Sequence, residues 1–173
     1  MDQLSDQLER TRARLVASFP DARLAFTVFR GELTVTVPTG VLLDVCRFLR
    51  AEEELDYGFL VDITAVDYPQ RGDRFCLVYH LLSMQRRARL SLKTYVPEDE
   101  PVPSLTELWP GANFYEREVY DLFGVHFSGH PDLRRIMMPE DWEGHPLRKD
   151  YPLTTEPVPF SHDWEERGRP TPY

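Results

Sequence analysis

The stretch FLVDITAVDYPQRGDRFCLVYHLLSMQRRARLSLKTYV, residues 59–96, decides the fold because it predicts three consecutive β-strands. Apolar and aromatic runs cover residues 59–67, 74–84 and 87–96, and short polar turns separate them. Connections this short favour antiparallel pairing between neighbouring strands. In the third run, alternate residues are expected on one buried face of the sheet: Leu90, Leu92, Thr94 and Val96.

Two predicted helices and a hairpin precede these strands. One helical face is shared by Leu4, Leu8, Thr11, Leu15 and Phe19, and Pro20 ends the pattern. Residues 24–29 and 32–37 flank Arg30-Gly31 and predict a β-hairpin, while residues 39–49 predict an amphipathic helix with Thr39 as its N-cap. The order helix, two strands, helix, three strands predicts a two-layer α+β domain, with an antiparallel sheet and both helices on one face.

The pattern changes after residue 97. Ser104-x-x-Glu107 is a capping-box spacing, which predicts a short helix that ends at Trp109. Residues 112–123 predict the last helix, with Gly124 as its C′ residue.

The remaining chain has the composition of an extended segment. Residues 128–173 contain eight of the fifteen prolines and no helical or strand periodicity. Its apolar side chains are too few to offset the conformational entropy of ordering it, so we expect contacts from outside the chain to order it. We therefore predict a core domain over residues 1–108, a signature helix over 109–124 and an extended, proline-rich, partner-wrapping segment over 125–173.

Composition excludes several classes of protein. A net charge of −9 is unlike the basic surface of a general nucleic-acid binder. No apolar run approaches the length of a membrane span. The two cysteines, Cys46 and Cys76, are too few to ligate an iron–sulfur cluster and are expected to be buried. Asp62 and Asp67 are expected on one solvent-facing side of the sheet.

The predicted last helix carries an unusual density of charge. Glu116 and Glu118 point about 200° apart on a helix, so they cannot form an acid/base pair. Asp121 lies three residues after Glu118 and four after Arg117, which is the spacing of paired surface charges. These residues predict either a self-paired exposed face or a charged surface that contacts a partner protein.

The histidines leave a second class of function open, that of a metal-dependent enzyme. His126 and His130 have the H-x₃-H spacing that occurs in zinc sites, although the glycine and proline around His130 disfavour a helix. The alternative is a free-standing metal-dependent enzyme that uses these histidines with Glu118 and Asp121. Nucleophile-elbow, zinc-protease and nucleotide-binding motifs do not occur.

The segment WPGANFYEREVYDLFGVHFSGHPDLRRIMMPEDWEGHPLRKDYPL, residues 109–153, resembles the signature region of a known family. The matching motifs are Glu116-Arg117-Glu118, Asp121-Leu122-Phe123, Gly129-His130-Pro131, Arg134-Arg135 and Pro146 through Pro152. The family is the 30 kDa subunit, also called the C subunit, of proton-pumping NADH:quinone oxidoreductase, respiratory complex I.

This resemblance implies a non-redox subunit of the peripheral arm, on the cytoplasmic side of the bacterial cell membrane. It implies no catalytic, metal-binding or cofactor-binding residue in this chain, with FMN, iron–sulfur clusters and quinone on other subunits. It also implies packing against the hydrogenase-like subunit of the complex. The expected interface residues are the charged and histidine side chains of the signature: Glu116, Arg117, Glu118, Asp121, His130, Arg134, Arg135, His145, Arg148, Lys149 and Asp150.

Two further expectations follow from the resemblance. Some family members are fused to the hydrogenase-like subunit, and because this chain stops at Tyr173 we expect the separate form. The equivalent subunit of a photosynthetic or hydrogenase-type relative of complex I, with a different electron donor, remains an alternative.

Overall fold

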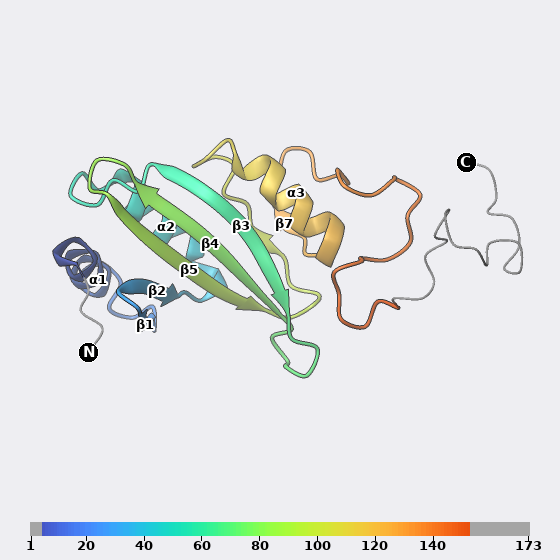
Figure 1. Cartoon of the computed structure of the whole chain (residues 1–173), viewed down its shortest axis with the longest axis horizontal. Coiled ribbons are helices and arrows are strands. Elements are labelled where there is room, and N and C mark those ends of the chain that lie inside the picture. The colour runs from blue at the N-terminus through green and yellow to red at the C-terminus, as the bar shows by residue number, and fades with distance from the viewer. Residues whose placement is uncertain (1–4, 153–173) are drawn as a thin grey trace, which may run out of the picture.

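A five-stranded sheet forms the centre of the computed structural model, which describes residues 5–152 (Figure 1). The strands lie in the order β1-β2-β5-β4-β3. The helices and longer strands are α1 (Asp6–Ser18), β1 (Ala25–Phe29), β2 (Glu32–Thr36), α2 (Leu42–Ala51), β3 (Phe59–Asp67), β4 (Phe75–Ser83), β5 (Ala88–Val96) and α3 (Ala112–Phe123). A 3-10 turn (Thr39–Val41) precedes α2, and β6 (Val102–Pro103) pairs with β7 (Phe127–Ser128). This order confirms the predicted α+β class.

One strand pairing differs from the predicted antiparallel arrangement. Three of the four pairings in this sheet are antiparallel, but β2 runs parallel to β5, with Leu33 opposite Leu90. Short turns favour antiparallel pairing only between the strands that they join. Because α2, β3 and β4 lie between β2 and β5 in the sequence, no hairpin joins these two strands and their parallel direction is allowed.

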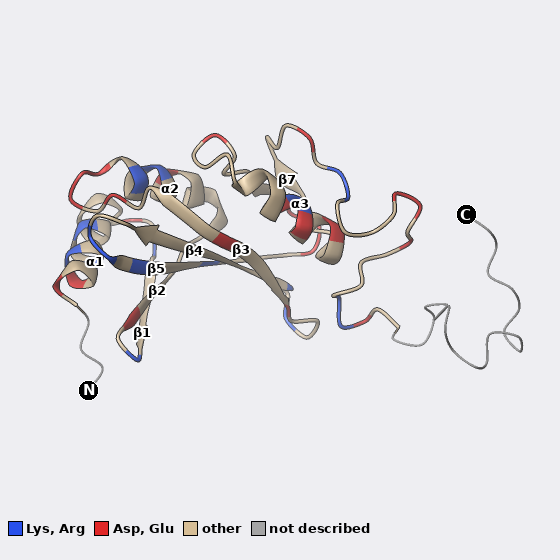
Figure 2. Cartoon of the chain, turned by 45° about the horizontal axis from the view of Figure 1, so that its top comes forward, with Lys and Arg blue, Asp and Glu red and all other residues tan. Residues whose placement is uncertain are grey.

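The hydrophobic core lies on one face of the sheet. Leu77 and Tyr79 of β4 and Leu92 of β5 are fully buried there, and α2 and α3 cover this face (Figure 2). The ring of Phe75 on β4 contacts Phe123 of α3 with centroids 6.4 Å apart. The opposite face is open, and it exposes about half of the Phe59 side chain, 53%.

Three local predictions were wrong. Thr39 is not the N-cap of α2, because it begins the preceding 3-10 turn and its hydroxyl lies 3.1 Å from Thr94 Oγ1 on β5. Asp67 is buried, not solvent-facing, because Cα pairing puts it opposite Phe75 on the core face, whereas Asp62 lies opposite His80 on the open face. Residues 104–109 form turns and not a helix. The Ser104 hydroxyl bonds to a carboxylate on α3, so it does not cap a helix of its own.

After α3 the described chain runs to residue 152 with β7 as its only regular element (Figure 1). Val125 and Phe127 join the same core as the sheet. Within residues 5–152, the helices are too short and too polar for a membrane crossing.

Candidate functional site

The candidate site is built on α3, whose two ends meet different parts of the chain. Ala112, Val119 and Phe123 form its buried apolar face, and the helix ends at Gly124 in the left-handed conformation, φ 78°. Two carboxylates on this helix, Glu116 and Asp121, have no exposed surface. Buried carboxylates must be hydrogen-bonded, and their partners define the site.

Glu116 fixes the turn that leads into α3. Its Oε1 accepts a hydrogen bond from the Leu105 N–H at 2.7 Å, and its Oε2 accepts one from the Ser104 hydroxyl at 2.7 Å. Within residues 5–152 it forms no ion pair with a cation. Burial raises the pKa of Glu116 to about 7, although the hydrogen bonds from Leu105 and Ser104 oppose this rise.

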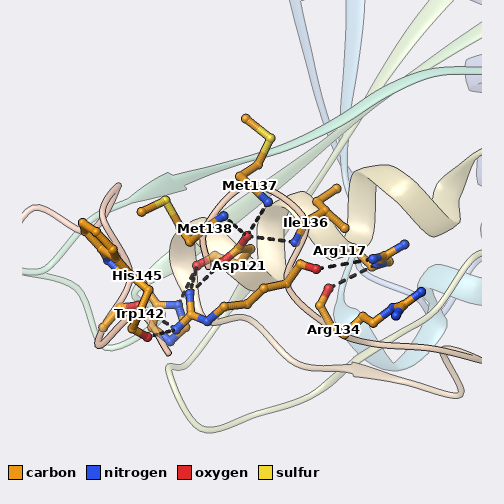
Figure 3. Close-up of polar contacts among 10 residues, drawn as sticks. Arg117, Asp121, Arg134, Ile136, Met137, Met138, Trp142 and His145 are labelled. Carbon is orange, nitrogen blue, oxygen red and sulfur yellow. Dashed lines mark hydrogen bonds and ion pairs between the residues drawn. The ribbon is translucent and has the colours of Figure 1, made fainter. Parts of the chain in front are cut away.

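Asp121 binds the backbone of the segment that follows α3 (Figure 3). Its Oδ2 accepts three consecutive backbone N–H groups, from Ile136 at 3.0 Å, Met137 at 2.7 Å and Met138 at 2.9 Å. Its Oδ1 pairs with the Arg135 guanidinium at 2.6 Å. Burial alone would raise the pKa of Asp121, but these amides and the guanidinium lower it below its ordinary value.

Two arginines complete this loop by binding carbonyl groups (Figure 3). Arg135 donates to the carbonyl oxygens of Trp142 at 2.9 Å and Gly144 at 3.0 Å. Arg117 donates to the carbonyl oxygens of Arg134 at 3.1 Å and Arg135 at 3.4 Å. The predicted Arg117–Asp121 pair is therefore wrong, because both side chains have partners in the segment that follows the helix.

The last turn of α3 is capped by residues more than twenty positions downstream. His145 Nδ1 donates to the Asp121 carbonyl at 2.8 Å, and Arg148 Nε donates to the Phe123 carbonyl at 2.6 Å. These bonds satisfy carbonyl groups that a helix C-terminus leaves free. A Cβ on Gly124 would lie 2.5 Å from Arg148 Nη2 and 2.6 Å from the His145 ring, so this close packing needs a glycine.

A second charged cluster, absent from the prediction, joins this segment to the sheet. Arg74 pairs with Asp67 at 2.8 Å, with Glu98 at 2.8 Å and with Asp150 at 2.8 Å. Asp67 also accepts the Lys149 N–H at 2.8 Å. The hydrogen bonds from Arg74 lower the pKa of Asp67 and of Glu98. The alternation of side chains along a strand was the sequence signal that could have predicted a buried Asp67, because Asp67 shares a face with Ile63 and Ala65.

The predicted interface residues range from fully buried to exposed, and Lys149 and Asp150 are among the exposed ones. Most have polar contacts within the chain: Glu116, Arg117, Asp121, His130, Arg135, His145, Arg148, Lys149 and Asp150. Glu116 and Asp121 are fully enclosed, so they act from inside the chain. Glu118 and Arg134 are exposed, and Arg134 pairs with Asp132 at 2.9 Å.

His126 and His130, the histidines of the predicted metal-dependent enzyme, do not form a cluster with carboxylates in the described residues. His130 Nε2 lies 3.2 Å from the Asn113 carbonyl, and its Nδ1 accepts the Asp132 N–H at 3.0 Å, so both ring nitrogens are engaged. His126 is exposed and its ring contacts Tyr120. Across residues 5–152, no cluster of three or more His, Cys, Asp or Glu side chains has the arrangement of a metal site.

Three apolar side chains of the segment that follows α3 are exposed. Ile136 exposes 37% and Met137 62% of their surface, and Leu147 is half exposed. Figure 3 shows Ile136 and Met137 extending from the backbone that Asp121 holds. These residues lie in the part of the sequence without helical or strand periodicity, so no spacing rule predicts their exposure.

Comparisons with known proteins agree on one family. Residues 35–157 match the family described as respiratory-chain NADH dehydrogenase, 30 Kd subunit. The NADH-quinone oxidoreductase C subunit of Roseiflexus castenholzii is 58% identical over 150 residues, which cover 86% of each chain. The mitochondrial 30.4 kDa subunit of NADH-ubiquinone oxidoreductase of Neurospora crassa is 47% identical over 87% of this chain and 53% of its own.

Two solved structures share the fold. A trypsin-resistant fragment of Nqo5 superposes with a TM-score of 0.64 at 36% identity, covering 73% of this chain and 99% of the fragment. A chain of the membrane-bound sulfane sulfur reductase, an archaeal respiratory membrane complex, gives a TM-score of 0.75 at 28% identity and covers 86% of this chain and 88% of its own.

Proposed function

Because the chain belongs to the 30 kDa subunit family of the respiratory-chain NADH dehydrogenase, we propose that it holds neighbouring subunits in place through the surface around α3. It is a peripheral-arm subunit of complex I, NADH-quinone oxidoreductase. The complex transfers electrons from NADH to quinone and couples this to proton translocation. The family match over residues 35–157, which includes all of α3, is the observation that carries this function.

We propose that the redox groups of the complex, FMN, iron–sulfur clusters and quinone, lie on other subunits. The donor chemistry of this chain supports the assignment. Cys46 and Cys76 are both buried, and two thiols cannot supply the four ligands of a cluster. Both nitrogens of His130 are hydrogen-bonded within the chain. In this proposal the isolated chain contributes no catalytic residue.

We propose the hydrogenase-like subunit of the complex as the main partner, on the cytoplasmic side of the membrane. The internally bonded residues supply the framework, because the Asp121 contacts fix the backbone at 136–138. The exposed groups on that framework then face the partner: Glu118, Arg134, Ile136, Met137 and Leu147. Protein interfaces commonly combine exposed apolar side chains such as these with charged ones.

We propose the predicted partner-wrapping role for the extended C-terminal segment, with one change. Residues 125–152 are attached to α3 and to β3 by hydrogen bonds, which help to offset the conformational entropy of ordering this segment. We propose that a partner covers the outer side of this attached segment. Residues 153–173 lie outside the described part of the chain.

Charge reversal at Glu118 tests the interface. Glu118→Lys, introduced into the intact complex, is expected to reduce its assembly or its NADH-quinone reductase activity. A like-charge contact across an interface costs several kcal/mol, whereas an exposed helix charge contributes only a few tenths to folding.

The matched control is Glu9→Lys, an exposed acid with the same charge change on α1. The isolated Glu118→Lys chain should unfold at the wild-type urea concentration. Normal assembly and turnover of Glu118→Lys would remove this helix from the interface.

Identity favours the NADH-linked complex over a relative with another electron donor. The quinone oxidoreductase subunits are 47% and 58% identical to this chain, and the sulfane sulfur reductase chain is 28% identical. Purification of the native complex, with a test for bound FMN and NADH oxidation, distinguishes the two.

A further inference from the structure

Glu116 lies at the inner end of a line of hydroxyl groups. Its Oε2 is 2.7 Å from Ser104 Oγ, and Ser104 Oγ is 2.9 Å from Thr106 Oγ1. Ser104 is buried, while Thr106 is partly exposed. The line therefore runs from a fully enclosed carboxyl group, through Ser104, to a partly exposed residue.

The carboxyl group is suited to gain and lose a proton at neutral pH. It receives hydrogen bonds from two neutral groups, the Leu105 amide and the Ser104 hydroxyl. Burial raises its pKa from 4.5 to about 7, so both the acid and the carboxylate are populated near pH 7.

The titratable groups around Glu116 do not carry a compensating charge. Tyr79 faces it from β4, and burial, with Cys46 of α2 and Glu116 nearby, raises the pKa of Tyr79 well above its ordinary value. Burial also raises the pKa of Cys46. Both groups are neutral at pH 7, and within residues 5–152 the buried Tyr79 hydroxyl has no hydrogen-bond partner, so it is not part of the line.

We propose that Glu116, Ser104 and Thr106 form a proton-binding site with its own hydroxyl relay, through which a proton enters and leaves without opening the core. On release, the Glu116 proton passes from Oε2 to Ser104 Oγ. The Ser104 hydroxyl proton passes to Thr106 Oγ1, and the Thr106 proton passes to water. Each hydroxyl ends with one proton, and the carboxylate gains the negative charge.

The hydrogen bonds can be satisfied before and after the transfer. With Glu116 ionised, Ser104 donates to Oε2 and accepts from Thr106, both from its hydroxyl and from its N–H at 3.2 Å. With Glu116 protonated, the carboxylic acid donates to Ser104, which donates in turn to Thr106 Oγ1. A serine hydroxyl has one donor and two acceptor sites, so both arrangements fit. Leu105 N–H bonds to Oε1 in each case.

Time-resolved infrared spectroscopy on the full chain tests the relay. A rapid pH jump across pH 7 is followed by the C=O stretch of the protonated carboxyl group, assigned as the band that Glu116→Gln removes. Thr106→Val removes the outer hydroxyl but keeps the side-chain shape. It is expected to slow the band's appearance and decay by about tenfold, an increase of about 1.4 kcal/mol in the barrier, and to leave the titration midpoint unchanged.

Thr106→Ser is the matched control, since it keeps the hydroxyl and should retain the wild-type rate. Ser104→Ala removes the inner hydroxyl and should slow the transfer as Thr106→Val does. A wild-type rate in Thr106→Val would overturn the relay. Equal slowing in Thr106→Ser would assign the effect to packing and overturn it too. Failure to find a carboxyl band that titrates near pH 7 and disappears in Glu116→Gln would overturn the proton-binding site itself.

Discussion

The two buried carboxylates of α3 are five residues apart and have opposite environments. Glu116, toward the start of the helix, has two neutral donors, and its pKa is raised. Asp121, toward the end, has three amide donors and a guanidinium, and its pKa is lowered. Burial opposes ionisation at both sites, so the number and charge of the donors determine which carboxyl group is ionised.

The two acids also attach different parts of the chain to α3. Glu116 attaches the 104–105 turn to the helix inside the core, and it can do so in either protonation state. Asp121 attaches residues 135–138, and its ion pair with Arg135 requires the carboxylate. The end of α3 that holds residues 135–138 therefore depends on a permanent charge, while the end that holds the 104–105 turn does not.

Removal of the Asp121 carboxylate should have the largest effect on stability. Asp121→Ala leaves the Arg135 guanidinium and three amides without their acceptor, which we expect to lower the free energy of unfolding by about 3–5 kcal/mol. Urea denaturation of the full chain measures this. The control, Glu118→Ala, removes an exposed acid from the same helix and should change stability by less than about 0.5 kcal/mol. Similar values for both variants would remove the contrast between the buried and the exposed face.

The second-largest effect should be the pH dependence of the free energy of unfolding, which distinguishes Glu116 from Asp121. The folded chain binds this proton more tightly than the unfolded chain, with pKa values of about 7 and 4.5. Its contribution to stability is therefore complete below pH 4.5, falls between pH 4.5 and 7, and is absent above pH 7. The change is about 3 kcal/mol.

Glu116→Gln lacks this dependence, so its stability relative to wild type should rise by about 3 kcal/mol across the same window. Urea denaturation at several pH values gives this difference and cancels the other titrating groups. A difference that stays constant with pH would show that the Glu116 pKa is ordinary. Asp121 has the opposite dependence, because its contribution is lost only as the pH falls through its lowered pKa.

Gly124 tests how closely the downstream segment packs on the end of α3. Gly124→Ala places a Cβ at a positive φ of 78° against Arg148 and His145, and we expect a loss of about 1–3 kcal/mol. Gly111→Ala is the control, since its φ is −63° and nothing lies within 4 Å of the new Cβ. Thermal unfolding of both variants should show a lower melting temperature for Gly124→Ala alone. Unfolding of both at the wild-type temperature would mean that the segment is loosely attached.

The exposed Asp132–Arg134 ion pair should have the smallest effect. Both side chains are more than half exposed, at 55% and 63%, and solvent screens such a pair. Asp132→Ala is expected to lower the unfolding free energy by less than about 1 kcal/mol, and high salt should abolish even that difference. Salt-independent destabilisation beyond this range would show that the Asp132 side chain supports the segment in a way other than its ion pair with Arg134.

Periodicity in the sequence predicted the elements but not their polar partners. The predicted helix over residues 112–123 has the observed bounds, and the three strands agree to within a residue at each end. Helical spacing also contained a signal that Glu116 is buried. It falls on the same stripe as Ala112, Val119 and Phe123, all of which are buried. An acid on an apolar stripe predicts a buried carboxyl group with donors elsewhere in the chain.

Those donors could not be predicted from local spacing. Asp121 is bound by residues 14 to 17 positions later, and Asp67 by a backbone N–H 82 positions later. Short-range rules pair residues three or four apart on a helix, and they therefore predict the Arg117–Asp121 pair that the structure lacks. Contacts between residues this far apart depend on the tertiary path of the whole chain. Local spacing rules applied to a single sequence do not predict that path.

The parallel pairing of β2 with β5 constrains the order in which the chain can fold. The β1–β2 hairpin is complete by residue 36, but the strand beside it begins at residue 88. During synthesis the hairpin therefore leaves the ribosome well before its neighbour exists, with an unpaired edge. The β3–β4–β5 meander can form from local turns, and docking of the early hairpin must follow as a slower, long-range step. Until then, that free strand edge is where a newly made chain is most open to pairing with the wrong partner.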